Sequence, residues 1–228
     1  MATCKILTRN CHFLTVSCII IGMNKVAERK LRQYPSAIIS EQELASLWGG
    51  SAASSYARNK RAVQNGDLIR IKRGLYIINK ELVRKLPNSF ELAQWIYAPS
   101  YISFESALSY HNLIPEAVYT ITSATIKRSK IFITPSRHFS YLNLPTPNFF
   151  FGVAYISEEN VHYLMATPWK ALFDFIYYYA KDYHTLSDVE DDLRLDKEEL
   201  PPINREELTT LENYYQDNRV SKFIHHFN

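Results

Sequence analysis

Between residues 24 and 78 the spacing of apolar positions changes from that of helices to that of strands. Over residues 24–34, 41–48 and 51–65 apolar side chains recur every three or four positions, which predicts three helices. Residues 68–72 then alternate apolar and basic side chains, and residues 75–78 return as a second strand. We therefore expect three helices followed by a hairpin, with a short extended stretch between the first two helices.

The ends of these elements carry their own signals. Ser40 precedes the second helix and Glu43 follows three residues later, which is the spacing of a capping box. Gly49 and Gly50 end that helix and allow a tight turn into the third. Arg73-Gly74 favours a tight turn between the two strands. Helix, glycine turn, helix and hairpin in this order predict a winged helix-turn-helix.

The remainder of the chain predicts a different architecture. A linker over residues 80–88 is followed by two short helices, then by several strands that we expect to be mostly antiparallel, and finally by helices. The last helix is expected over residues 205–218. The predicted fold class is α+β, with three parts: an extension over residues 1–22, a winged helix-turn-helix over residues 23–86 and a larger mixed α+β domain over residues 87–228.

Charge is unevenly distributed along the 228 residues. The formal net charge is only +3, but residues 23–86 contain 13 Lys and Arg against 5 Asp and Glu, whereas residues 87–228 contain 11 against 18. A basic N-terminal third is typical of a protein that binds a polyanion, with chance clustering on a solvated surface as the alternative.

The basic side chains concentrate on the third helix and the hairpin. Ser54, Arg58, Arg61 and Asn65 recur at helical spacing as one polar stripe, and the opposite packing face is expected to contain Ala52, Tyr56, Asn59 and Val63. Small hydroxyl side chains at the helix start let backbone N–H groups approach phosphates, and Arg and Asn suit guanine and adenine edges.

A basic hairpin tip can in turn reach a flanking phosphate or a minor groove. We therefore expect a DNA-binding surface that comprises Ser54, Ser55, Arg58, Lys60, Arg61, Asn65, Arg70, Lys72 and Arg73. On this view, replacing Arg58 and Arg61 by alanine abolishes operator binding and leaves the fold intact. The second domain has one basic patch, at Lys127, Arg128 and Lys130, which is either a solvated loop or a secondary contact to phosphate or a partner.

Three segments resemble the AbiEi family, the antitoxins of abortive-infection toxin–antitoxin systems. They are NGDLIRIKRGLYII at residues 65–78, YISFESALSYHNLIP at 101–115 and ATPWKALFDFI at 166–176. Trp169 departs from the pattern, because an acidic residue is commoner there. The resemblance spans roughly residues 24–228. It implies a repressor that binds double-stranded DNA at inverted repeats in its own operator and counteracts a nucleotidyltransferase-like toxin through the second domain. A solitary regulator without a toxin is the alternative.

Known catalytic patterns are absent from the sequence, which contains no Walker A loop, nucleophile elbow, HExxH motif or dinucleotide fingerprint. We accordingly predict no catalytic residue, no cofactor and no metal site, and we expect His111 to be a packed, hydrogen-bonded side chain. The acidic stretch at 188–196 is expected to be a solvated face. A less favoured alternative is a nuclease relic in the second domain that uses Asp191 and Asp192.

The first 22 residues differ from the rest. They contain all three cysteines, so a disulfide framework or zinc finger is not expected in the body of the chain, which fits a cytoplasmic protein. Their apolar run over residues 13–21 is too short to span a bilayer and lacks a signal-peptide cleavage site. The segment reads either as an extension or as a mis-called start before Met23, and no membrane partner is expected.

Overall fold

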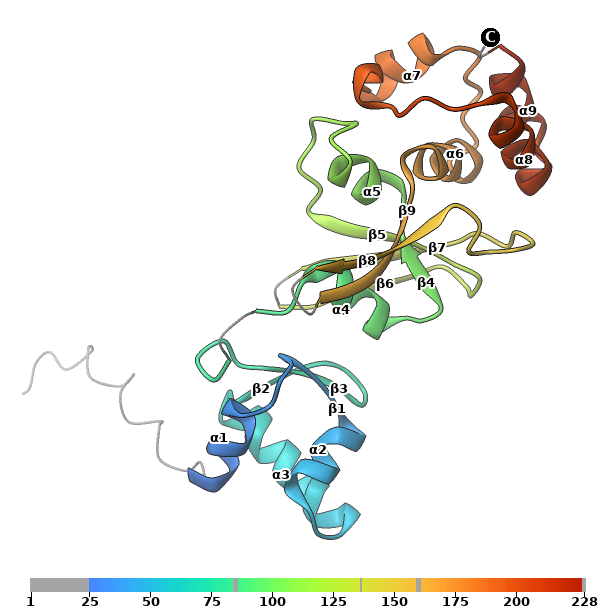
Figure 1. The fold of residues 1–228 in the computed structure, drawn as a ribbon. Coiled ribbons are helices and arrows are strands. Elements are labelled where there is room, and N and C mark those ends of the chain that lie inside the picture. Colours follow the sequence, from blue (N-terminus) through green and yellow to red (C-terminus); the bar gives the residue numbers. More distant parts are fainter. Residues whose placement is uncertain (1–24, 84–85, 136, 159–160, 227–228) are drawn as a thin grey trace, which may run out of the picture. The chain divides into compact units, whose positions relative to one another are not determined.

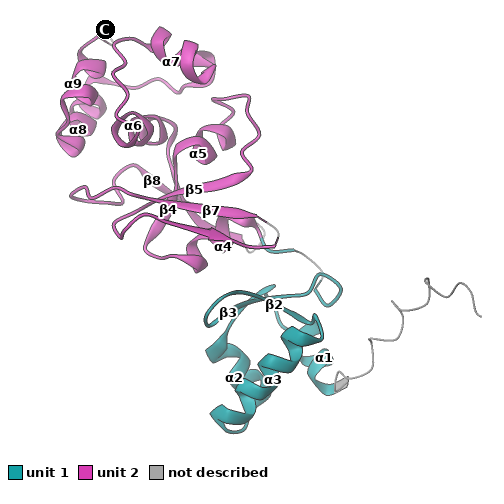
Figure 2. Cartoon of the chain, turned by 180° about the vertical axis from the view of Figure 1, so that it is seen from behind, with its two compact units in different colours: residues 1–87 teal, residues 88–228 magenta. Residues whose placement is uncertain are grey.

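The computed structural model describes residues 25–83, 86–135, 137–158 and 161–226. The chain divides into two compact units, residues 1–87 and residues 88–228, which Figure 2 colours teal and magenta. The predicted boundary stands one residue earlier, after residue 86. The expected extension over residues 1–22 lies outside the described residues. Two sheets with helices packed on them make the chain a mixed α+β protein.

The described residues of unit 1 form three helices and one small sheet, which Figure 1 labels. Its sheet is antiparallel throughout, with strand order β1-β3-β2, so the hairpin partner β3 lies in the middle. Each element predicted from the apolar pattern is present, with ends shifted by a few residues. In chain order these elements are α1 (Lys25–Arg32), β1 (Ile38–Ser40), α2 (Glu41–Trp48), α3 (Ala52–Gln64), β2 (Leu68–Lys72) and β3 (Leu75–Ile78).

One apolar cluster holds unit 1 together. Leu31 from α1, Leu44 from α2 and Ile39 from β1 are fully buried, and they meet Leu68 and Ile78 from the hairpin. Full burial of a side chain of this size contributes about 1.5–3 kcal/mol, so these five residues supply much of the stability of a small unit. The core thus connects every element that positions α3.

The predicted capping box at the start of α2 is confirmed. The Ser40 hydroxyl accepts a hydrogen bond from the Glu43 N–H at 3.2 Å, and the Glu43 carboxylate accepts one from the Ser40 N–H at 2.7 Å. Both bonds satisfy N–H groups that the helix itself leaves unpaired. They set the residue at which β1 ends and α2 begins.

Unit 2 contains a six-stranded mixed sheet with strand order β6-β7-β5-β4-β9-β8. Figure 1 shows α4 on one face of this sheet and α5 and α6 on the other. Its elements are α4 (Ser89–Ile96), β4 (Ser100–Ile102), α5 (Phe104–Tyr110), β5 (Thr120–Thr125), β6 (Lys130–Ile133), β7 (His138–Asn143), β8 (Val153–Glu158), β9 (Val161–Ala166), α6 (Pro168–Tyr178), α7 (Leu186–Leu193), a 3-10 turn (Lys197–Glu199), α8 (Arg205–Tyr215) and α9 (Asn218–His225).

The strands of unit 2 are mostly antiparallel, as predicted, and the parallel pairs are β5–β7 and β4–β9. Two other details differ from the predictions. Strand β4 was not predicted, although it lies inside the sheet between β5 and β9, because three residues are too few to show an alternating pattern. The single helix expected over residues 205–218 ends earlier, because Gln216 adopts a left-handed conformation with φ of 50° and separates α8 from α9.

A buried ion pair lies at the centre of unit 2. Lys170 and Asp174 stand one turn apart on α6, their side chains are both fully buried, and the Lys170 ammonium bonds the Asp174 carboxylate directly. The ammonium also donates to the hydroxyl groups of Tyr101 at 2.9 Å and Tyr215 at 3.0 Å. Burial lowers the pKa of Lys170, against the opposing effect of Asp174. The same burial raises the pKa of both tyrosines well above the ordinary value.

The Asp174 carboxylate is as fully bonded as its partner. It accepts hydrogen bonds from the Tyr101 hydroxyl at 3.0 Å, the Ser103 hydroxyl at 2.6 Å and the Tyr215 hydroxyl at 2.6 Å. These residues come from β4, from the start of α5 and from α8, so one network ties three elements to α6. Residues 101–115 and residues 166–176, which are far apart in the sequence, meet in this network.

Replacing Lys170 by methionine tests how strongly the network stabilises unit 2. The substitution leaves the Asp174 carboxylate buried without its cation, and removal of one partner of a buried pair costs about 3–5 kcal/mol. We expect a urea denaturation curve, followed by circular dichroism, to show a loss of that size. The double variant Lys170→Met with Asp174→Leu should recover part of it, because the uncompensated charge is gone. A double variant less stable than either single variant would contradict this account.

Candidate nucleic-acid interface

The exposed face of α3 is rotated from the one predicted. Ser55, Asn59 and Ala62 are the buried residues of the helix. By helical periodicity the opposite, outward face is centred on Ala57. Its other members are Ala53, Lys60, Arg61 and Gln64, all exposed.

The predicted packing face was therefore wrong at two positions and right at two. Ala52 is exposed, and Tyr56 has 65% of its surface exposed. Asn59 is buried as expected, and Val63 is half-buried against the core of unit 1. Tyr56 lies at the border of the outward face of α3. The periodicity of the sequence predicted a packing face that is rotated about the helix axis from the buried one. Alanines at 52, 53, 57 and 62 fit either side of the helix, so they do not determine which side is buried.

Two serines predicted to contact DNA have other surroundings. Ser55 is only 4% exposed, so its hydroxyl is not accessible to a phosphate. Ser55 is therefore not part of the candidate DNA-binding surface. The Ser54 hydroxyl donates to the Ser51 carbonyl at 2.8 Å, and the Ser51 hydroxyl accepts from the Ser54 N–H at 3.3 Å. Both bonds belong to the N-terminal cap of α3.

Arg58 links α3 to the end of α2. Its guanidinium donates to the carbonyl groups of Trp48 and Gly49, each at 2.9 Å. These carbonyls lie at the C-terminus of α2, where helical carbonyl groups lack partners and a cation is favourable. The sequence suggested a base or phosphate contact at Arg58, but its guanidinium is engaged in the turn between the two helices.

A second contact fixes the same two helices from inside. The Trp48 indole N–H donates to the Asn59 side-chain carbonyl at 2.7 Å, and both residues are buried. Between them Gly50 has φ of 89°, and a Cβ there would lie 2.9 Å from the Ser54 hydroxyl oxygen. The turn thus requires glycine at this position for both conformation and space.

Lys60 and Arg61 are exposed on α3, and neither forms an ion pair within the described residues. Asn65, at the end of α3, is also exposed, and its side chain hydrogen-bonds Asp67. Asp67 is the sole acidic residue between Gly50 and Lys80, and burial raises its pKa, with the Asn65 bond acting in the opposite sense. The charge of α3 is therefore presented without a neighbouring carboxylate on the helix.

The hairpin carries the remaining predicted residues. Arg70 in β2 and Arg73 in the turn are exposed, and Lys72 is half-buried beyond an irregularity in the pairing that follows Arg70. The turn is held at the start of α2, because the Glu41 N–H donates to the Gly74 carbonyl at 2.9 Å. The basic turn is thus short and anchored, with one acidic residue, Glu41, beside it.

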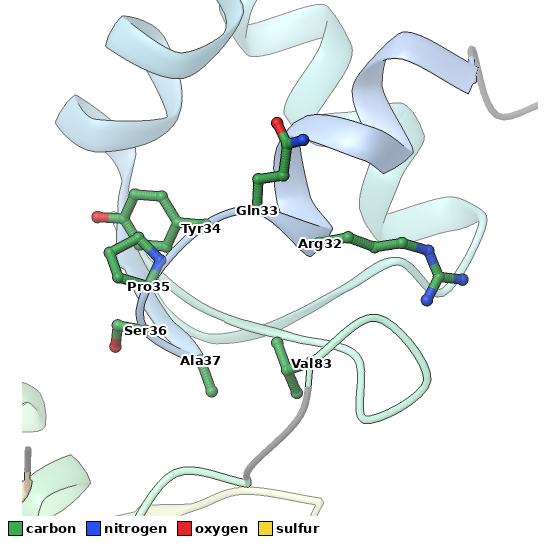
Figure 3. A pocket seen from close by; sticks show the side chains of 7 residues that line it. All are labelled: Arg32, Gln33, Tyr34, Pro35, Ser36, Ala37 and Val83. Atoms are coloured by element: carbon green, nitrogen blue, oxygen red, sulfur yellow. The ribbon is translucent and has the colours of Figure 1, made fainter.

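A pocket of about 410 Å³ opens at the end of α1 in unit 1. Figure 3 shows that its Arg32 and Tyr34 side chains point in opposite directions. Arg32 bonds Glu28 and the Glu81 carbonyl, while burial and the Glu43 carboxylate raise the pKa of Tyr34 to about 12. The polar groups of Arg32 and Tyr34 are therefore already engaged within unit 1 and do not converge on a ligand position.

The predicted basic patch of unit 2 is exposed but not simply solvated. Lys127 donates to the Ala98 carbonyl at 2.5 Å and lies 5.4 Å from the centre of the Tyr97 ring. The Lys130 ammonium lies 4.8 Å from the centre of the Phe132 ring. Aromatic faces attract cations at such distances, so both lysines are held along the sheet rather than extended into water.

The remaining predicted side chains of unit 2 have structural surroundings. His111 Nε2 lies 2.9 Å from the Ala166 carbonyl oxygen, as expected for a packed histidine. Asp192 accepts hydrogen bonds from Lys181 and Tyr183.

In the part of the chain that the structure describes, no group of three or more His, Cys, Asp and Glu side chains could hold a metal ion. No described helix has the length and apolarity needed to cross a bilayer.

No model of a known protein family matches the chain, and no curated protein matches its sequence.

Replacing Arg58 by alanine is expected to destabilise unit 1, because two carbonyl groups of α2 lose a charged donor. Hydrogen bonds to charged groups contribute about 1.5–3 kcal/mol, and partial exposure places this loss near the lower end of that range. Thermal unfolding of the full chain measures it. Lys60→Ala, two residues along the same helix, serves as the control and should leave the unfolding temperature almost unchanged. Equal effects of the two substitutions would contradict the capping role.

Proposed function

We propose that unit 1 is a winged helix-turn-helix and that the protein is a DNA-binding transcriptional repressor. The element order α1, β1, α2, α3 and a β2–β3 hairpin supports this proposal, as does the capped α2 with its glycine turn. The observation that carries it is the outward face of α3. Lys60 and Arg61 project there beside the small side chains of Ala53 and Ala57, without ion pairs in the described chain.

A helix with this face is suited to the major groove. The groove of B-DNA is wide enough for an α-helix, and alanine at the centre of the face lets the helix backbone approach closely. Lys60 and Arg61 then reach phosphates or guanine edges, and Gln64 can pair with an adenine edge. Arg70, Lys72 and Arg73 in the hairpin would contact flanking phosphates, which contribute affinity and salt dependence rather than sequence recognition.

We further propose that the protein is an AbiEi-type antitoxin that represses its own operon and counteracts a nucleotidyltransferase-like toxin. The resemblance supports this, and it extends into unit 2. There, however, the two resembling segments supply Tyr101, Ser103, Lys170 and Asp174, which are all buried. In unit 2 the resemblance therefore concerns internal packing and does not itself identify the surface that acts on a toxin. A solitary regulator remains the alternative proposal.

Substituting both Lys60 and Arg61 by alanine should abolish binding to a DNA duplex that spans the region upstream of the protein's own reading frame. The loss of phosphate contacts also reduces the slope of log affinity against log salt concentration by about 0.9 for each contact. A gel-shift titration at several salt concentrations measures both effects, and circular dichroism checks the fold.

The matched control removes the same charge elsewhere in unit 1. Arg29 on α1 and Lys80 after β3 are both exposed, and the Arg29→Ala, Lys80→Ala variant should retain operator binding. If both double variants bind like the wild type, α3 is not the recognition helix. If both double variants lose binding equally, DNA binding depends on the net charge of unit 1 and not on the position of the charges, and the assignment of α3 as the recognition helix fails.

The antitoxin proposal is tested by the neighbouring reading frame. If that frame encodes a nucleotidyltransferase, its expression alone should arrest growth, and co-expression with the full chain should restore it. The Lys60→Ala, Arg61→Ala variant should still restore growth when both genes are expressed from foreign promoters, because repression of the operon then has no role. Failure of the wild-type chain to restore growth would leave the protein as a solitary repressor.

A further inference from the structure

Strand β6 is an edge strand with an unusual surface. It stands at one end of the six-stranded sheet, paired with β7 on one side, and no described strand lies on its other side. Ile131 and Ile133 share one face of the strand and are 67% and 74% exposed. Phe132 points to the opposite face and packs against the rings of Tyr97 and Tyr141. The strand is therefore held in place while two large apolar side chains stay in water.

The backbone groups of the same two isoleucines point away from the sheet. The Thr134 N–H donates to the Arg137 carbonyl at 3.1 Å in the hairpin that joins β6 to β7. In an antiparallel ladder, residues that bond the partner strand alternate with residues that do not. Counting back from Thr134, Phe132 and Lys130 face β7, whereas Ile131 and Ile133 direct their N–H and C=O groups outward. An incoming strand would meet backbone groups and apolar side chains together.

The charged side chains of residues 126–137, the segment that contains this edge strand, are all of one sign. Lys127, Arg128 and Lys130 lie at its start and Arg137 beyond its end, and all four are exposed. None forms an ion pair with another described residue. Residues 126–137 contain no Asp or Glu, although residues 87–228 contain 18. Although unit 2 as a whole is acidic, this segment has no carboxylates. It therefore places a local cluster of cations beside the exposed apolar side chains of β6.

We propose that β6 binds an extended acidic segment of another protein, which adds to the sheet as a further strand. Main-chain hydrogen bonds to Ile131 and Ile133 supply strand addition, their side chains bury apolar residues of the partner, and the flanking cations select carboxylates at its ends. The partner is thus a peptide segment in which apolar residues alternate with Asp or Glu.

Two other occupants fit the edge less well. In a second copy paired antiparallel about Phe132, Lys127 lies opposite Arg137 of the other chain, so like charges face one another at both ends of the strand. Nucleic acid offers phosphates to the cations, but it has no N–H groups arranged as a strand and leaves Ile131 and Ile133 exposed to water. Each of these occupants predicts a distinct experimental outcome.

Lysine on an edge strand often prevents aggregation rather than selecting a partner. Lys130 does not occupy that position here. Its ammonium lies over the rings of Tyr97 and Phe132, on the face opposite to Ile131 and Ile133. The apolar face of the edge is therefore left open by the lysine that could have covered it.

The probe is a fluorescent peptide of about eight residues in which valine and glutamate alternate, a length typical of one strand. Fluorescence anisotropy with the full chain measures its binding. A valine–lysine peptide and the valine–glutamate peptide with N-methylated alternate amides are the controls. The first reverses the charge, and the second keeps the charge but cannot form a ladder. We expect both to bind at least about tenfold more weakly than the probe.

Three variants separate the contributions. Ile133→Pro removes an N–H that faces outward, and an edge strand tolerates this change. It should lower the affinity for the probe about tenfold. Arg128→Glu with Arg137→Glu reverses two charges whose side chains have no described partner, and should lower the affinity at least as much. Ile126→Asn removes an exposed apolar side chain outside the strand and should leave binding unchanged.

Several results would overturn the proposal. Absence of probe binding to the wild type at millimolar concentration is one, and equal binding of the N-methylated peptide is another. A dimer in sedimentation that Ile133→Pro dissociates would assign the edge to a second copy. Displacement of the probe by unrelated duplex DNA from both the wild type and the Lys60→Ala, Arg61→Ala variant would assign it to nucleic acid. Should Ile133→Pro fail to fold, the N-methylated peptide and the charge-reversal variant still decide.

Discussion

The hydrogen bond between the Trp48 indole and the Asn59 amide determines how unit 1 presents α3. It is buried, so it forms where water does not compete, and it joins the last turn of α2 to the middle of α3. Arg58 closes the same junction from outside by bonding the final carbonyls of α2. Because one face of α3 is engaged in this way, the opposite face is left exposed to solvent.

The elements of unit 1 could be predicted because each has a local signal. The capping box at Ser40 and Glu43, the two glycines and the alternation at 68–72 depend only on neighbouring residues. The orientation of α3 could not, because it depends on which of several small side chains meets α2. Tyr56 read as apolar and therefore internal, whereas the buried positions are filled by a serine, an asparagine and an alanine.

In unit 2, features that depend on residues far apart in the sequence were even harder to predict. Lysine and aspartate one turn apart on a helix ordinarily indicate a solvated surface, so this pair by itself does not predict burial. The partners that make burial tolerable, Tyr101, Ser103 and Tyr215, lie 41 or more residues away from Asp174. Strand β4, which contributes Tyr101, was missed for the related reason that its place in the sheet comes from long-range pairing.

The division of α3 into two sets of positions has a consequence for how such a protein can change. Ser55, Asn59 and Ala62 determine where the helix lies, and Arg58 fixes its junction with α2. Ala53, Ala57, Lys60 and Gln64 are exposed and do not belong to the buried side of the helix. Substitutions in this second set can therefore change the exposed face of α3 without disturbing the scaffold. Under the DNA-binding function that we propose, the recognised sequence can then change independently of folding, residue by residue along one helix.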